Sequence, residues 1–309
     1  MLALALPFAA GVLSEASAAH SPAAHATTLQ SSRPRSPVRH TIKTVFLIVM
    51  ENQNWSSIQG NTSNAPYINS LLSGANDSQT SYATQYFNPS GNHPSLSNYL
   101  WLEAGTNFGI ADNNPPSSHP LNTTSHLITL LNNAGISWKA YQEGISDGTC
   151  PLSDNYPYSP RHNAFVYFND VTSNSAYCTA HERSYSDLAG DLANNTVARY
   201  NFITPNLCDD MHNSCSPTND AIKQGDSWLQ TNLPAILSSQ AYKNGGAVFI
   251  TWDEGEGSDG PIGMIVLSPA AKGHGYHNAI RYTHSSTLRT LEEIYGVRPL
   301  LGMRRTPPT

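Results

Sequence analysis

Two uninterrupted apolar runs, each followed closely by carboxylates, constrain this chain more than any other feature of its sequence. Residues 45–50 read VFLIVM and lead into Glu51, while residues 247–250 read AVFI and lead, after Thr-Trp, into Asp253 and Glu254. An apolar run without polar alternation is typical of a strand that is covered on both faces of a sheet. The two runs therefore predict central strands of an α/β fold with acidic side chains at their carboxyl ends.

Strand-like and helix-like segments alternate along most of the chain. Strand patterns cover residues 45–50, 137–141, 201–204, 247–252 and 262–267, and helix patterns cover residues 65–72, 96–102, 125–133, 221–233 and 285–295. Such alternation predicts an α/β fold, with a mainly parallel central sheet flanked by helices on both faces. Residues 144–189 are rich in Ser, Asn, Tyr and Pro and have no clear periodicity. We expect them to form an irregular insertion.

Length and charge favour one domain and argue against a nucleic-acid partner. A chain of 309 residues can bury one large core, and it has no internal repeat or Pro/Gly-rich linker. A net charge of -6 without any basic cluster argues against a nucleic-acid partner. We expect residues 41–309 to form a single domain without a stable membrane span.

The N-terminal residues predict export from the cell. Residues 2–13 are apolar and are followed by small residues up to position 19, which resembles a signal peptide with its cleavage site, although a basic n-region is missing. Residues 20–40 are rich in Ser, Pro and Ala, as in a disordered lead-in. We therefore predict a signal peptide over residues 1–19 and a secreted or periplasmic protein.

Four cysteines allow three disulfide pairings. Sequential pairing, Cys150 with Cys178 and Cys208 with Cys215, is the simplest of them. The alternative is a zinc site made of thiolates, but the cysteines lack the usual C-x2-C spacing and the predicted compartment is oxidising.

A third strand-like run adds further donors at the same edge of the predicted sheet. Residues 200–204 lead, within a few residues, into Asp210 and His212. Ligands bind at the carboxyl ends of strands in open α/β sheets, so these donors and the two carboxylate pairs are expected to gather there. A single strand-end carboxylate could equally face solvent or cap the next helix. Carboxylates at two strand ends favour a metal-assisted site.

Ser95 is the candidate nucleophile. It precedes the predicted helix of residues 96–102, and the amides of a first helical turn favour an anion. The alternative is that Ser95 is a plain N-cap of that helix.

Four sequence blocks together resemble the bacterial phosphoesterase family that contains secreted acid phosphatases and phospholipases C and is related to the alkaline phosphatase superfamily. The blocks are residues 49–52, residues 93–99, residues 210–212 with 224–228, and residues 251–254 with His284. They follow the family's order between residues 41 and 297. The resemblance implies an alkaline phosphatase-like fold, and it is closest to compact secreted acid phosphatases, some of which act on phosphoinositides.

The resemblance also implies a divalent metal ion at the site. The implied metal ligands are Glu51, Asn52, Ser95, Asp210, Asp253 and Glu254. Carboxylate, amide and hydroxyl oxygens suit a hard or borderline divalent ion, whose identity and number are left open. Ser95 would attack phosphorus while the metal lowers the pKa of its hydroxyl. His212 and His284, with Asp210, match positions that either bind a second metal or hold the phosphate and protonate the leaving alcohol.

Three residues are implied as substrate-binding, namely His93, Asn98 and His162. His162 matches a histidine-containing segment of the family, although a loop histidine is more often solvated. Lys139 either faces phosphate or, as the sequence favours, is an ordinary polar position on a strand.

These features predict a secreted, metal-dependent phosphomonoesterase that works through a phosphoserine. Its substrate is expected to be a phosphate ester, a class that includes phospholipids and phosphoinositides. A phospholipase C-type phosphodiesterase with the same site is the nearest alternative. A secreted metal-binding protein without activity is a third reading, but it would not need Ser95.

Overall fold

The computed structural model describes residues 41–75, 78–257 and 259–302. The predicted signal peptide and the predicted lead-in, residues 1–40, lie outside the described residues.

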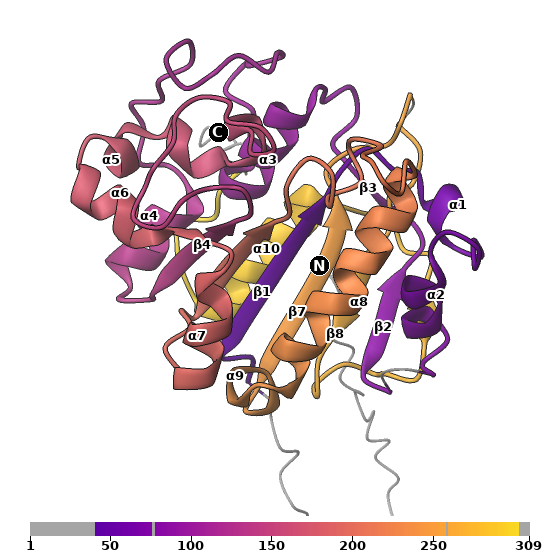
Figure 1. Cartoon of the computed structure of the whole chain (residues 1–309). Coiled ribbons are helices and arrows are strands. Elements are labelled where there is room, and N and C mark those ends of the chain that lie inside the picture. Colours follow the sequence, from indigo (N-terminus) through magenta and orange to yellow (C-terminus); the bar gives the residue numbers. More distant parts are fainter. Residues whose placement is uncertain (1–40, 76–77, 258, 303–309) are drawn as a thin grey trace, which may run out of the picture.

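An eight-stranded sheet in the order β5-β4-β6-β1-β7-β8-β2-β9 forms the centre of the molecule (Figure 1). Its strands are β1 (Thr44–Met50), β2 (Thr80–Ala83), β4 (Trp138–Gln142), β5 (Glu182–Ser184), β6 (Tyr200–Thr204), β7 (Gly246–Trp252), β8 (Met264–Leu267) and β9 (Tyr276–Asn278). In the described sheet β8 runs antiparallel to both of its neighbours, and the other neighbouring strands are parallel. This confirms the predicted mainly parallel sheet. Two further strands, β3 (Tyr86–Phe87) and β10 (Tyr282–Thr283), pair with each other.

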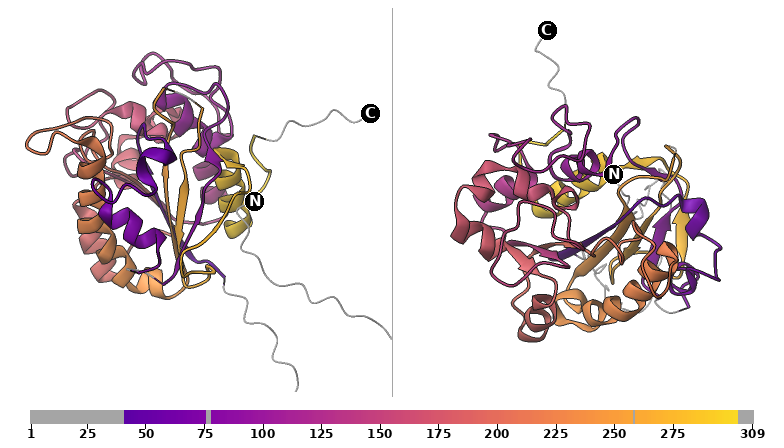
Figure 2. Two further views of the ribbon diagram at one scale, coloured as in Figure 1. Left: turned by 90° about the vertical axis from the view of Figure 1, so that its right-hand side faces the viewer. Right: turned by 45° about the horizontal axis from the view of Figure 1, so that its top comes forward.

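Helices cover both faces of the sheet, as the alternating pattern predicts. They are α1 (Trp55–Ile58), α2 (Pro66–Leu72), α3 (Ser95–Ala104), α4 (Leu127–Asn133), α5 (Asn169–Thr172), α6 (Ser175–His181), α7 (Asp187–Asn194), α8 (Ala221–Ser238), α9 (Gln240–Lys243) and α10 (His284–Tyr295), with 3-10 helices η1 (Pro160–His162) and η2 (Ala164–Tyr167). Figure 2 shows α8 on one side of the sheet and α10 on the other, seen along the sheet edge.

The central strands owe their position to the apolar runs. Almost every side chain of β1 and every side chain of β7 is buried, and β1 pairs with β6 on one side and β7 on the other. Met50 lies opposite Trp252 at the end of this register. Because parallel strands end at the same edge, the residues that follow β1, β6 and β7 meet there.

The predicted elements are present within two residues at each end, with one exception. Helix α8 continues past residue 233 to Ser238 although Pro234 lies inside it, because Leu233 and Ile236 are both buried in the core. The stabilisation from packing an apolar helix face thus exceeds the cost of the hydrogen bond that proline cannot donate.

The prediction of an irregular insertion at residues 144–189 was wrong in part. The segment contains η1, η2, α5, α6 and the edge strand β5. Elements of three to seven residues are too short to give a readable periodicity.

The cysteines form the two predicted sequential disulfides, Cys150–Cys178 and Cys208–Cys215. The thiolate zinc site is therefore excluded. Among the described residues, no helix is both long enough and apolar enough to span a membrane.

Candidate functional site

The ends of three strands are joined by backbone hydrogen bonds, and these place the acidic residues together. The amide of Glu51, after β1, donates to the carbonyl of Asp210, 2.7 Å away, and the amide of Asp253, after β7, donates to the carbonyl of Met50 at 2.9 Å. The amide of Asn52 donates to Asp253 Oδ1 at 3.1 Å. Glu51, Asp210 and Asp253 are all fully buried. The structure thus brings together carboxylates that are far apart in the sequence.

Two carboxylate oxygens of this cluster have no hydrogen-bond partner among the described residues. They are Glu51 Oε1 and Asp253 Oδ2, and both are buried. A buried carboxylate oxygen is costly unless it is hydrogen-bonded or coordinates a cation. These two atoms therefore fit the divalent metal ion that the sequence implies.

The pKa values of the cluster also indicate that its carboxylates need a nearby positive charge in order to be ionised together. Burial, together with the charges of Asp253 and Asp210, holds the pKa of Glu51 well above its usual range. Burial and the charge of Glu254 raise the pKa of Asp253 to about 8. The carboxylates therefore ionise together only when a nearby positive charge offsets their repulsion.

Ser95 is the first residue of α3 and lies beside Glu51. Its Oγ donates a hydrogen bond to Glu51 Oε2, 2.9 Å away, and Pro94 occupies the N-cap position. The alternative reading of Ser95 as a plain N-cap was therefore wrong. Its hydroxyl is aimed at the carboxylate cluster.

Glu254 is held by two of the residues implied as substrate-binding. Its Oε2 accepts from His93 Nδ1 at 2.7 Å and from Asn98 Nδ2 at 2.8 Å. Asn98 Oδ1 accepts from Asn92 Nδ2, so the polar atoms of the buried Asn98 are all engaged within the protein. This geometry makes Asn98 a support for Glu254 and gives it no free group for substrate.

His93 lies at the rim of the site between two carboxylates. Its Nε2 is 2.7 Å from Asp259 Oδ1, and its Nδ1 contacts Glu254. Partial burial opposes protonation, but the hydrogen bonds and charges of Asp259 and Glu254 outweigh it and raise the pKa of His93. His93 is thus arranged to carry a positive charge where the cleft opens.

His162 is buried, which excludes the alternative reading of it as a solvated loop histidine. It lies in η1 with Nδ1 3.0 Å from Asp210 Oδ2 and Nε2 3.2 Å from Glu51 Oε1. Its ring stacks on Tyr99, with the centroids 5.3 Å apart. Both oxygens of Asp210 are occupied, because Oδ1 accepts from the amide of His212. Asp210 thus orients the ring of His162 and the backbone of His212, and each of its oxygens has a hydrogen-bond partner.

His284 has both ring nitrogens engaged inside the protein. Nε2 is 2.6 Å from the carbonyl oxygen of Asp253, and Nδ1 is 3.0 Å from the hydroxyl of Tyr86. Burial lowers the pKa of His284 to about 4, so the ring is neutral and donates through Nε2. In this position it holds the backbone of Asp253, and neither proposed role, general acid nor ligand, is supported by its contacts.

A cleft of about 1010 Å³ opens beside the buried cluster. Its walls include Asn52, His93, His212 and Glu254, with Asp220, Glu256 and Asp259 further out. The described residues that line it include no Lys or Arg. Among the residues that line the cleft, histidine is therefore the side chain that can carry a positive charge towards a bound phosphate. Lys139 contributes nothing here, because its Nζ pairs with Asp191 at 2.6 Å.

Sequence reasoning missed Tyr99 and Asp259. Tyr99 is four residues after Ser95, a spacing that puts both on one face of α3 and could have identified it. Asp259 follows a glycine-rich turn without any pattern, and its contact with His93 gave no signal in the sequence.

Comparison with known proteins agrees with this geometry. The model of the Phosphoesterase family matches residues 78–298. Phosphatidylinositol-3-phosphatase of Mycobacterium tuberculosis is 30% identical over 272 residues, which cover 87% of this chain and 81% of that protein. Phosphate-repressible acid phosphatase of Penicillium chrysogenum is 30% identical over 228 residues, or 71% of this chain. The match covers 52% of that fungal protein, so the chain spans about half its length.

Solved structures show the fold. An alkaline phosphatase superfamily protein from Vibrio parahaemolyticus has a TM-score of 0.53 at 11% identity, with coverage of 85% of this chain and 68% of that chain. Phosphonate monoester hydrolase of Agrobacterium radiobacter has a TM-score of 0.52 at 12% identity, with coverage of 83% and 74%. The expected alkaline phosphatase-like fold is confirmed. The family model and the relatives together show that the chain belongs to the Phosphoesterase family and is a hydrolase of phosphate esters.

Proposed function

We propose that this protein is a secreted, metal-dependent phosphomonoesterase of the acid phosphatase type, which transfers a phosphoryl group to Ser95 before water releases it. The observation that carries the proposal is the hydrogen bond of Ser95 Oγ to Glu51 Oε2, 2.9 Å long, beside two buried carboxylate oxygens without a partner. It supports a hydroxyl that is oriented for attack and a cation next to it.

Glu51 and Asp253 are the residues that would hold the cation most directly, with Ser95, Asn52 and Glu254 around them. A divalent ion supplies charge neutralisation for the phosphate oxygens and a lower pKa for the serine hydroxyl. The free oxygens of Glu51 and Asp253 support this assignment.

The chain's own residues account for the rest of the reaction. Glu51 Oε2 accepts the hydroxyl hydrogen and so fixes the direction of Ser95 Oγ. The positive end of the α3 helix dipole favours the negative charge of an incoming phosphate. As the bond from Ser95 to phosphorus forms, the bond from phosphorus to the alcohol breaks, and a water then repeats the displacement to regenerate the hydroxyl.

Two further observations bear on location and substrate. Two disulfides are typical of proteins outside the reducing cytosol, which supports secretion. The similarity to phosphatidylinositol-3-phosphatase makes a phosphoinositide monoester a substrate to test.

The test is a hydrolysis screen of an aryl phosphate against an aryl phosphorylcholine, with and without chelator. We expect the monoester to be cleaved faster, chelator to abolish the activity, and added divalent metal to restore it. Faster cleavage of the phosphorylcholine ester would instead identify a phospholipase C-type phosphodiesterase. Cleavage of neither ester under any metal would favour the metal-binding protein without activity.

A further inference from the structure

A buried carboxyl group outside the cleft, that of Glu182, contacts the turn that carries His162. Glu182 is the first residue of β5, and Asn163 follows His162 at the end of η1. Asn163 Nδ2 donates to Glu182 Oε2 at 2.7 Å. The two side chains are buried, with exposed fractions of 0% for Glu182 and 1% for Asn163. This hydrogen bond ties η1 to an edge strand of the central sheet.

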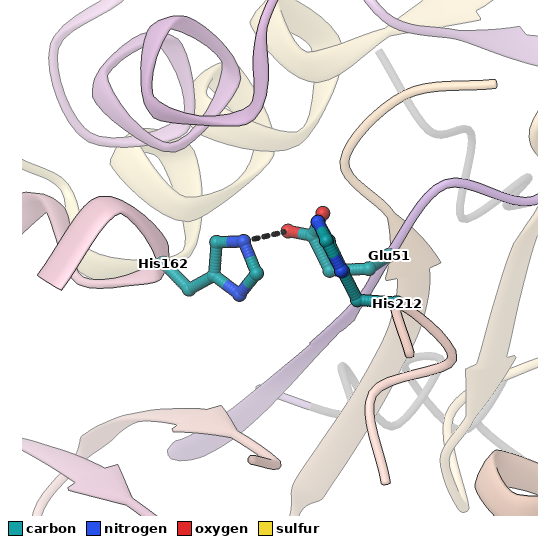
Figure 3. Close-up of side chains that lie close together, drawn as sticks. All are labelled: Glu51, His162 and His212. Atoms are coloured by element: carbon teal, nitrogen blue, oxygen red, sulfur yellow. Dashed lines mark ion pairs between the residues drawn. The ribbon is translucent and has the colours of Figure 1, made fainter. Parts of the chain in front are cut away.

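The same turn holds His162 against the carboxylate cluster. His162 Nε2 lies 3.2 Å from Glu51 Oε1, and its Nδ1 lies 3.0 Å from Asp210 Oδ2. Figure 3 shows the His162 ring facing the Glu51 carboxylate. A 3-10 turn of three residues has few backbone hydrogen bonds, so its position depends on side-chain contacts. The contact that fixes Asn163 therefore also fixes His162.

The hydrogen bonds around Asn163 lack one donor. Tyr158 Oη accepts from Asn163 Nδ2 at 3.2 Å and donates its own hydrogen to the carbonyl of Pro151 at 3.0 Å. Two buried acceptor atoms then have no partner among the described residues, namely Glu182 Oε1 and Asn163 Oδ1. A buried acceptor without a donor is unfavourable. Both atoms need a hydrogen that none of the described side chains donates to them.

A proton on Glu182 supplies that hydrogen. A protonated carboxyl group donates through one oxygen and accepts through the other, so it can pair with an amide through two hydrogen bonds. One of these bonds is present, and the two atoms that the other would join are the two without a partner. We propose that Glu182 is protonated in the active enzyme and, through its pair with Asn163, acts as a positioning residue for His162.

The charges around Glu182 agree with a neutral carboxyl group. Burial raises the pKa of Glu182 to about 8, although the hydrogen bond from Asn163 opposes the shift. Tyr158, the titratable group that faces it in the described part of the chain, has a pKa held well above its usual range by burial and by the charge of Glu182. The chain neighbours contact other groups, since His181 bonds to a backbone carbonyl of α6 and Arg183 pairs with a carboxylate of α7.

The dependence of activity on pH tests this role, which rests on the proposed function. Glu182→Gln keeps two hydrogen bonds to Asn163 but has no proton to lose, whereas Glu182→Leu forms neither bond. We expect kcat/KM of the wild type to fall above about pH 8 relative to that of Glu182→Gln, by about tenfold per pH unit. Glu182→Leu should be slower than Glu182→Gln at every pH. Glu292→Gln, which replaces a buried carboxyl group of α10 that accepts from the amide of Leu301, is the matched control and should keep the wild-type profile.

Two further measurements need no turnover. The infrared spectrum of the wild type well below pH 8 should contain the carbonyl band of a buried carboxylic acid, and Glu182→Gln should lack it. An open turn exposes the carboxyl group, which then has its ordinary pKa of 4.5, so the closed turn binds the proton more tightly. Hydrogen-exchange protection of the amides of His162 and Asn163 should therefore fall in the wild type as pH rises from about 5 to about 8, and should not show this fall in Glu182→Gln.

The possible failures are distinguishable. An alkaline limb shared by the wild type and Glu182→Gln, or an infrared spectrum without the carboxylic acid band, would overturn the proton on Glu182. Equal kcat/KM in Glu182→Gln and Glu182→Leu would overturn its role in positioning His162. If Glu182→Gln does not fold, the wild type decides, because exchange protection that is independent of pH contradicts the protonated pair. If no variant and no wild-type sample hydrolyses a phosphate ester, the proposed function fails, while the infrared band and the exchange data still report on Glu182.

Discussion

At the scale of single residues, Glu51 contacts two neighbours, each through a different carboxylate oxygen. Oε2 accepts from Ser95, and Oε1 faces His162 without a hydrogen bond. Burial makes the hydrogen bond from Ser95 stronger than it would be at the surface, because fewer water molecules compete. The geometry of the site therefore depends on a few buried atoms.

Replacing the nucleophile is the first prediction. Ser95→Ala should lower kcat for an aryl phosphate by roughly 10³-fold or more, because it removes the attacking oxygen. Ser97→Ala is the matched control, since Ser97 lies on the same helix and its Oγ donates only to the carbonyl of Pro94. Steady-state kinetics on both variants checks this, and a near wild-type rate in Ser95→Ala would remove Ser95 from the mechanism.

The role of His212 can be determined from how much its replacement slows the hydrolysis of substrates with different leaving groups. A general acid matters most for a poor leaving group, because an alkoxide needs a proton in the transition state and a nitrophenolate hardly does. If His212 is a metal ligand, His212→Asn should slow an alkyl phosphate and nitrophenyl phosphate to a similar extent. A loss confined to the alkyl phosphate would assign His212 as the acid.

At the scale of elements, the loop between β6 and α8 is supported from α8. Gln224 Nε2 donates to the carbonyl of Cys208 at 3.1 Å, and Gln224 Oε1 accepts from the amide of Cys215 at 2.8 Å. Asp226 accepts from the first amides of α2. The sequence block of residues 224–228 therefore acts by holding the loop that carries Asp210 and His212.

Gly225 offers a test of this support. A Cβ at Gly225 would lie 2.4 Å from Met211 Cγ, and Met211 lies between Asp210 and His212. Gly225→Ala should destabilise the protein by about 1–3 kcal/mol through overpacking, and it should lower kcat/KM. Gly190→Ala is the control, because a Cβ there would meet no described atom within 4 Å and should be neutral or stabilising. Denaturant unfolding compares the free energies of unfolding of the two variants. Equal values would show that α8 does not constrain Met211.

Central strands could be predicted from the sequence, while the contacts of the insertion could not. The apolar runs before Glu51 and Asp253 identified two neighbouring strands whose ends meet. His162 reaches Glu51 from a three-residue helix inside residues 144–189, where no periodicity exists to read. Its role depends on packing against Tyr99 and Asp210, which are distant in sequence.

At the scale of the whole molecule, a buried ion network joins three helices of one face. His126, at the start of α4, contacts Glu103 of α3 through Nδ1 at 3.0 Å and Asp170 of α5 through Nε2 at 3.0 Å. Burial opposes protonation of the ring. Hydrogen bonds to Asp170 and Glu103 outweigh that effect and raise the pKa of His126 to about 9.

Stability should therefore fall as pH rises towards 9. A histidine in the unfolded chain has a pKa of about 6.5, so the folded state binds this proton more tightly. Its contribution, roughly 3 kcal/mol, is fully present below about pH 6.5 and is lost as pH rises through about 9. The gap in free energy of unfolding between wild type and His126→Gln should shrink over that range. A gap that does not change with pH would contradict the charged network.

The stereochemistry at phosphorus distinguishes attack by Ser95 from direct attack by water. Each in-line displacement inverts the configuration, so a phosphoserine mechanism, with two displacements, retains it. The measurement is hydrolysis of a chiral, isotopically labelled thiophosphate monoester in labelled water, followed by analysis of the released thiophosphate. We expect net retention. Net inversion would show that water attacks the substrate directly and would contradict Ser95 as the nucleophile.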